Sequence, residues 1–151
     1  MMLAGEFQGF CRDLHDEAVD FFVDTVAPNS AVASILQFQL TLDRKLDTRN
    51  ARPDTLKEDF VRLGIDVNKE INAENPLEGP KWWTGLSKLN KARNAIAHSN
   101  HAALDNLKQE GHPIDQPTVL SWRGQLDGLA KTMDDVVATA LDSVLGAGRP
   151  W

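Results

Sequence analysis

The sequence predicts an all-α protein, an antiparallel bundle of four to five helices forming one domain over residues 1–151. Apolar residues recur at spacings of three and four in five segments, which is the periodicity of amphipathic helices. Breaks rich in proline, glycine and asparagine separate these segments. No internal repeat or domain-sized linker divides the chain, and its length is typical of a single domain. Helices that each bury one stripe against their neighbours give a bundle.

The first two segments lead from the N-terminus to residue 53. We expect the first helix from Leu3 to about Val26 and a cap for the next helix at Ser30. Residues 31–48 fit a helix, but 34–42 also alternate as a strand does. We favour a helix with two apolar faces, one toward the core and one toward a dimer partner. The stripe of the first helix comprises Phe7, Phe10, Cys11, Leu14, Ala18, Phe21 and Phe22.

The remaining segments complete the bundle. A third helix is expected to open at Asp54 or Thr55, with Glu58 completing a capping box, and to run to about Ile71, although Gly64 weakens its middle. Residues 75–80 form a loop, and a fourth helix spans about 81–98. Residues 101–117 are expected to be a polar connection with one helical turn in 102–108. The last helix is predicted over about 118–145, followed by a flexible tail from about 146.

Composition limits the classes of function. The net charge of −6 and the pI near 5.1 argue against a protein that coats nucleic acid non-specifically, since such proteins need a basic face. The single cysteine, Cys11, cannot form an internal disulfide, and no signal peptide or membrane-spanning run is evident. We therefore expect a cytoplasmic protein with no membrane association. Between Gly79 and Leu104 the chain has no acidic residue, which makes a local basic island of Lys81, Lys88, Lys91 and Arg93.

The fourth helix carries an arginine where core residues are expected. At about 100° per residue, Arg93 falls in the middle of the apolar stripe. A buried guanidinium needs a partner, so Arg93 either pairs with an acid such as Asp13, Asp16 or Asp66, or faces a wet cleft that receives an anion. The stripe comprises Trp82, Leu86, Leu89 and Ile96, and the polar flank beside it comprises Trp83, Asn90, Asn94 and His98, with His101 if the helix continues.

The segment Arg93-Asn94-Ala95-Ile96-Ala97-His98 resembles the signature of the HEPN superfamily, in which Arg, usually followed by Asn, precedes a His near a helix end. Residues 7–15 and 42–46 also resemble a group of bacterial HEPN-like proteins. The resemblance implies a metal-independent endoribonuclease, a toxin or phage-defence effector whose composite cleft forms in a homodimer. RNA and an antitoxin are then the expected partners. The alternatives are a non-catalytic module that binds RNA or nucleotide or mediates assembly, and a plain bundle in which Arg93 is a structural ion pair.

Residue chemistry agrees with the roles that the resemblance implies. An imidazole suits proton transfer near neutral pH, so His98 is the acid–base candidate. Arg93 offers a fork of donors for phosphate oxygens, and Asn94 can orient the imidazole or hold a phosphate oxygen. We expect no metal and no cofactor, because His98 and His101 have no cysteine or acid nearby in the sequence. The candidate RNA-binding residues are Lys88, Lys91, Asn90 and His101.

Three further residues carry expectations about burial. Trp82 is expected in the core, whereas the position of Trp83 is left open. Cys11 lies on an apolar stripe and is expected to be an inert buried thiol. His15 lies on the flank of the first helix, where we expect it at the surface; the alternative is that it approaches the cleft.

Overall fold

The computed structural model describes residues 2–151, and every regular element in that range is helical. The predicted fold class is therefore confirmed, as a bundle with three long helices and several short ones. No helix in the described range has the length and apolar character needed to cross a bilayer. The elements are α1 (Met2–Val26), α2 (Ala31–Thr41), α3 (Lys45–Thr48), α4 (Pro53–Phe60), the 3₁₀ turn η1 (Val61–Leu63), α5 (Val67–Glu74), α6 (Gly79–Ala97), α7 (His101–Gln109) and α8 (Gln116–Leu145).

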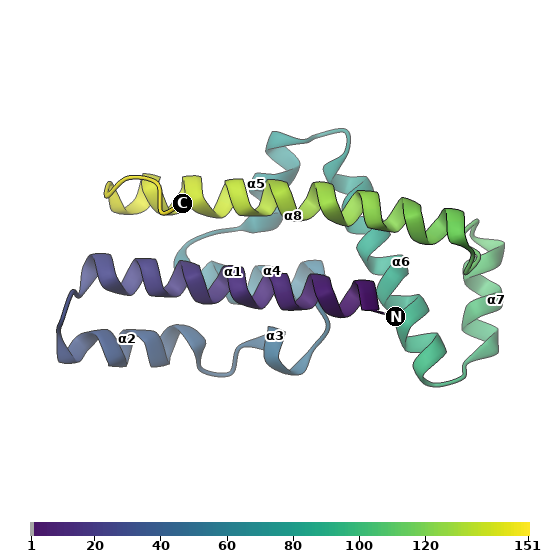
Figure 1. The fold of residues 1–151 in the computed structure, drawn as a ribbon, viewed down its shortest axis with the longest axis horizontal. Coiled ribbons are helices and arrows are strands. Elements are labelled where there is room, and N and C mark those ends of the chain that lie inside the picture. Colours follow the sequence, from purple (N-terminus) through teal and green to yellow (C-terminus); the bar gives the residue numbers. More distant parts are fainter. Residues whose placement is uncertain (1) are drawn as a thin grey trace.

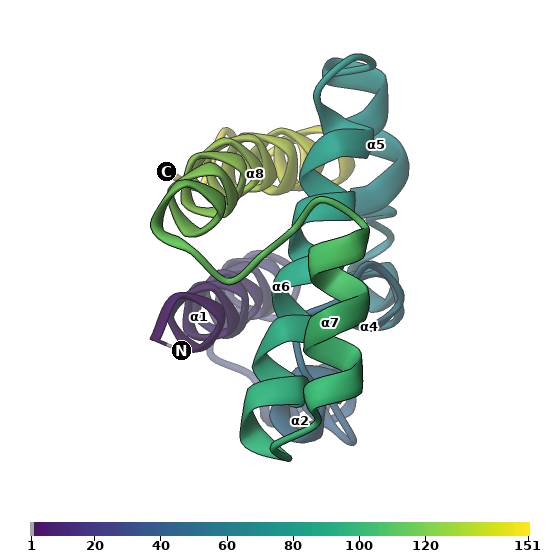
Figure 2. The same cartoon turned by 90° about the vertical axis from the view of Figure 1, so that its right-hand side faces the viewer.

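Two antiparallel hairpins and one long closing helix make up the architecture. α1 and α2 form the first hairpin, and α6 and α7 form the second (Figure 1). α8 lies beside α1 and runs in the same direction, while α6 crosses both at a steep angle (Figure 2). The core lies where α1, α6 and α8 meet, around Cys11, Leu89, Leu129 and Met133, all of which are almost completely buried.

The second predicted helix is real but ends early. α2 stops at Thr41, and the chain turns through Asp43, which has a positive φ of 53°, before the single turn α3. Leu36 and Leu40 pack partly against the core, as expected of one apolar face. No residue of α2 is fully buried, and its other apolar face lies open to solvent. That face comprises Val32, Ile35 and Phe38, which Leu42 extends beyond the helix end.

The prediction of one third helix is wrong, because the segment is split into α4, η1 and α5. Gly64 adopts a φ of 79°, a left-handed conformation that ends the turn before it and that side chains other than glycine rarely adopt. The predicted capping box is also wrong. Pro53 occupies the first turn of α4 without a side-chain cap, whereas Asp66 caps α5 by accepting a hydrogen bond from the Lys69 backbone N–H at 3.2 Å.

The buried face of α6 is rotated relative to the prediction. Trp83, left open by the sequence, is only 8% exposed, whereas Trp82, expected in the core, is half-buried. Trp82 packs against Gly128 of α8, where a Cβ would come within 2.9 Å of the indole ring. Ile96, predicted on the buried stripe, is 42% exposed near the end of the helix. The connection expected to hold one helical turn contains the nine-residue helix α7.

Candidate functional site at the end of α6

The residues of the motif lie in the last turns of α6 and at the tip of the α6–α7 hairpin. Arg93 and Asn94 are in the helix, and His98 is its C-cap residue. Ser99 follows with a positive φ of 50°, and Asn100 caps α7 by accepting the Ala103 backbone N–H at 3.0 Å. This short turn sends α7 back along α6 (Figure 2). The turn therefore presents His98 in an exposed position.

The Arg93 guanidinium is half-buried and bound by amides rather than by acids. Its Nη1 donates to Asn50 Oδ1 at 2.5 Å and to Gln8 Oε1 at 3.4 Å. No carboxylate oxygen among residues 2–151 lies within 4 Å of it, so the structural ion pair considered from the sequence is not formed. Because its hydrogen bonds use only one of its nitrogens and neutral partners, Arg93 keeps its charge and further donors.

Asn94 shares its hydrogen-bond partner Asn50 with Arg93 and also lines a cavity. Asn94 Oδ1 accepts a hydrogen bond from Asn50 Nδ2 at 3.2 Å. Asn94 and His98 also line a cavity of about 380 Å³ between α6 and α7, which Arg93 does not line. Within one chain, His98 therefore lines this cavity and Arg93 does not. The other lining residues are Lys91, Ala95, Asn100, Ala103, Asn106, Leu107 and Glu110.

The four candidate RNA-binding residues fall into different environments. Lys91 is exposed and lines the cavity, whereas Lys88 forms an ion pair with Glu110 across the hairpin. The hydrogen bond from Lys88 lowers the pKa of the Glu110 carboxyl. Asn90 is 5% exposed, and its Nδ2 donates to the backbone carbonyl of Ala51 at 2.7 Å, so it holds a loop rather than facing solvent. His101 is exposed at the start of α7 and does not line the cavity.

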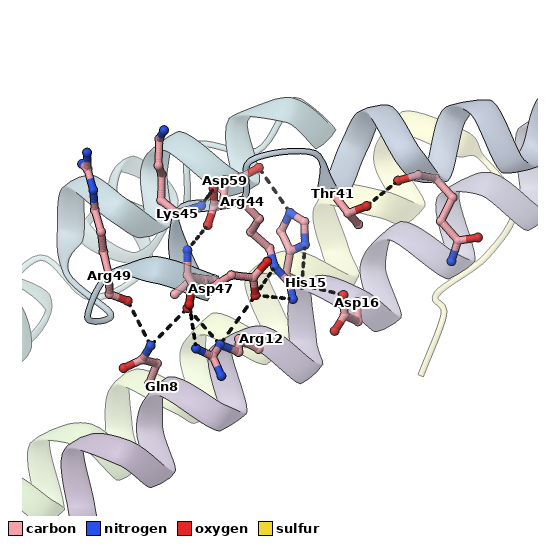
Figure 3. Close-up of polar contacts among 12 residues, drawn as sticks. Gln8, Arg12, His15, Asp16, Thr41, Arg44, Lys45, Asp47, Arg49 and Asp59 are labelled. Atoms are coloured by element: carbon pink, nitrogen blue, oxygen red, sulfur yellow. Dashed lines mark hydrogen bonds and ion pairs between the residues drawn. The ribbon is translucent and has the colours of Figure 1, made fainter.

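A second polar cluster, around His15, was not predicted. His15 was expected at the surface, but it is completely buried against Phe60. Its Nδ1 lies 3.4 Å from Arg44 Nη1, and its Nε2 lies 3.4 Å from the Asp59 carbonyl oxygen. Arg44 also pairs with Asp16 and Asp47 (Figure 3). Burial and the charge of Arg44 lower the pKa of His15, since both disfavour its protonated form.

Two other observations bear on the chemistry available. Cys11 is buried, as expected, and desolvation raises the pKa of its thiol far above the ordinary value. In the described part of the chain, no group of three His, Cys, Asp or Glu side chains is placed to hold a metal ion. The imidazole of His98 and the guanidinium of Arg93 are groups suited to acid–base and anion-binding chemistry.

Sequence reasoning missed the two residues that bind Arg93. Asn50 lies 43 residues before Arg93, in a segment interpreted only as a chain break, and Gln8 lies on the first helix. Gln8 lies within the 7–15 segment that carries the resemblance, but nothing in that segment indicates a contact with Arg93. The only feature that draws attention to Asn50 in the sequence is its position between Arg49 and Arg52.

These features define a helical domain of the HEPN type, with Arg, Asn and His at the end of the helix that precedes the last hairpin arm and the long final helix. The model of the RiboL-PSP-HEPN family matches residues 12–138, and the chain belongs to that family. Comparisons with curated proteins and with solved structures find no match.

Proposed function

We propose that the protein is a metal-independent endoribonuclease that cleaves RNA through Arg93, Asn94 and His98. The observation that carries this proposal is the state of Arg93, a half-buried arginine held by amides with no carboxylate partner in residues 2–151. A guanidinium held in this way is available to a phosphate. His98 lies exposed on the same helix end and lines a cavity of about 380 Å³.

The proposed reaction is an internal transfer at phosphorus. The ribose 2′-oxygen attacks the adjacent phosphorus, and the bond to the 5′-oxygen of the next nucleotide breaks. The 2′-hydroxyl proton is removed, and the leaving oxygen takes up a proton. His98 carries out proton transfer, for which an imidazole is suited near neutral pH. Arg93 stabilises the charge that develops on the phosphorane oxygens. The products are a 2′,3′-cyclic phosphate and a 5′-hydroxyl end.

A homodimer is the proposed active form. Within one chain, His98 lines the cavity between α6 and α7 and Arg93 does not, so a second copy is proposed to complete the cleft. Two apolar surfaces are available for this contact: Ile96 within the motif, and the open face of α2. Co-expressed Arg93→Ala and His98→Ala chains, each inactive alone, are expected to regain part of the activity in mixed dimers. A monomer at micromolar concentration in light scattering would contradict this arrangement.

The proposed activity is tested with a mixed RNA pool in EDTA. Wild type is expected to cleave the pool, and His98→Ala is expected not to cleave it. Because His98 is exposed, this variant is expected to keep its melting temperature within the small range of ordinary surface substitutions. A large loss of stability in His98→Ala would mark the residue as structural instead.

A non-catalytic module that binds RNA or nucleotide is the second candidate function. The net charge of −6 and the ion pair that engages Lys88 weaken the attraction of a long RNA, which within this candidate favours a short ligand such as a nucleotide. If wild type and His98→Ala both bind RNA and neither cleaves it, this second function is supported. If the ribonuclease is a toxin or a defence effector, expression of wild type arrests growth while expression of His98→Ala does not, and an antitoxin protein relieves the arrest.

A further inference from the structure

The loop between α3 and α4 lies against the motif although it is far from it in sequence. Its Asn50 side chain uses both ends of its amide. Oδ1 accepts from Arg93 Nη1, and Nδ2 donates to Asn94 Oδ1. A single side chain therefore fixes both residues, and it distinguishes them by hydrogen-bond polarity, since Arg93 can only donate.

This loop is held firmly on both sides of Asn50. Before it, Gln8 Nε2 donates to the carbonyl oxygens of Leu46 at 3.1 Å and Arg49 at 2.9 Å (Figure 3). After it, Asn90 Nδ2 donates to the carbonyl oxygen of Ala51, in a buried hydrogen bond. Gln8 and Asn90 come from α1 and α6, the helices that also meet at Arg93. The position of Asn50 is thus set by the same frame that carries the motif.

The charges of the loop point to an anionic ligand. Arg49 and Arg52 are both exposed, and neither has a carboxylate oxygen within 4 Å in residues 2–151. They flank Asn50 in sequence. The loop therefore carries two guanidinium groups without a carboxylate partner, and Asn50 binds a third, that of Arg93. In a chain of net charge −6, the two loop arginines without a carboxylate partner give a positive charge to the loop whose Asn50 contacts Arg93.

We infer that residues 49–52 form a second arm of the RNA site, in which Asn50 positions Arg93 and Asn94, and Arg49 and Arg52 bind phosphates that flank the cleaved one. This inference rests on the proposed ribonuclease function. Asn50 is a positioning residue, because it contacts the motif rather than the substrate. The ligand is the phosphodiester backbone of single-stranded RNA.

Binding measured without cleavage separates this inference from the ribonuclease proposal. All variants are made in full-length His98→Ala protein, and their affinity for a fluorescent single-stranded RNA is measured by anisotropy over a range of KCl concentrations. For single strands, each lost phosphate contact reduces the magnitude of the negative slope of log K against log salt by about 0.7. Arg49→Ala/Arg52→Ala is therefore expected to reduce this magnitude by about 1.4. The charge-matched control is Lys69→Ala/Lys131→Ala, two exposed cations in α5 and α8, outside both the loop and the motif. The control is expected to leave the slope unchanged.

The role of Asn50 is tested by Asn50→Asp beside Asn50→Ala, each in the same background and in wild type. The aspartate has the same shape but pairs with Arg93 and offsets its charge, and the exposed Asn94 amide turns to donate to the new carboxylate in place of the lost Asn50 donor. Asn50→Asp is therefore expected to retain its melting temperature while losing at least tenfold in RNA affinity. Asn50→Ala is expected to lose less affinity, because Arg93 remains charged although less well held.

Three results would overturn the inference: equal slopes for the loop and control double variants, unchanged affinity in Asn50→Asp, or no RNA binding by His98→Ala. A slope of smaller magnitude in the loop variant, together with a wild type that does not cleave RNA, would support the second arm and refute the ribonuclease proposal.

Discussion

Asp59 is predicted to be the main structural support of the segment that leads to the site. Its carboxylate is completely buried in α4 and accepts the backbone N–H groups of Lys45 and Leu46, each at 2.8 Å (Figure 3). These are the first residues of α3, whose N–H groups have no partner within their own helix. Substitution Asp59→Asn keeps the shape but replaces one accepting oxygen with an NH₂ group, which then faces a backbone donor.

The expected cost follows from these two hydrogen bonds. A hydrogen bond to a charged group contributes about 1.5–3 kcal/mol, and a buried donor left without a partner costs a similar amount. Asp59→Asn weakens one bond by removing its charge and loses the other, so we expect a loss of about 2–4 kcal/mol in the free energy of unfolding. For a domain of this size, each kcal/mol lowers the melting temperature by about 2–4 °C.

Urea unfolding followed by circular dichroism measures this loss, with Asp13→Asn as the matched control. Asp13 is exposed on α1, so its substitution changes the same charge and is expected to change the free energy by no more than about 0.5 kcal/mol. Equal unfolding midpoints for the two variants would refute the role assigned to Asp59.

Three further predictions concern the pH dependence of stability, two glycine substitutions and the reactivity of the cysteine. Burial and the charge of Arg44 hold the pKa of His15 below the unfolded value of about 6.5. Its contribution to the free energy of unfolding is complete above that pH. The contribution is lost as the pH falls below it, by up to about 1.4 kcal/mol per pH unit. Urea midpoints measured between pH 7.5 and 5 should therefore depend less on pH in His15→Gln than in wild type. Gly9→Ala is expected to stabilise α1 by about 0.5–1 kcal/mol, since a Cβ there meets nothing within 4 Å. Gly128→Ala is expected to destabilise the protein by about 1–3 kcal/mol, since its Cβ would clash with the Trp82 ring. Thermal unfolding of the two variants tests both expectations. Cys11 is expected to react with a thiol reagent only as fast as the protein unfolds, because the buried thiol has a raised pKa, and a rapid reaction of the folded protein would contradict its burial.

The fold class was predictable because it depends on periodicity, which is local. The stripes of α1 and α8 were read from the spacing of their apolar residues, and both helices end within a few residues of the predicted limits. The rotation of α6 was not predictable in this way. Its buried face is set by Gly85 and Gly128, which allow close contacts with Gln125 and Trp82, and by the α7 arm, which covers a side that the sequence left open to solvent.

The candidate site was predictable only as far as its motif. Arg93, Asn94 and His98 lie close together in sequence, so one helix end carries all three. The partners of Arg93 are contributed by Gln8 and Asn50, whose separation from it in sequence leaves no local signal. The acid partners considered for Arg93 illustrate the same limit, because Asp16 and Asp66 are engaged by Arg44 and Lys57 instead.

The chemistry of the RNA ends produced in EDTA tests the central claim most directly. Wild type is expected to produce fragments with 2′,3′-cyclic phosphate and 5′-hydroxyl ends, and His98→Ala is expected to produce none. Fragments with 5′-phosphate ends, or cleavage that stops when EDTA is added, would contradict the proposed mechanism. Intact RNA with a folded, dimeric wild type would contradict the ribonuclease activity itself and leave Arg93 as part of a binding site.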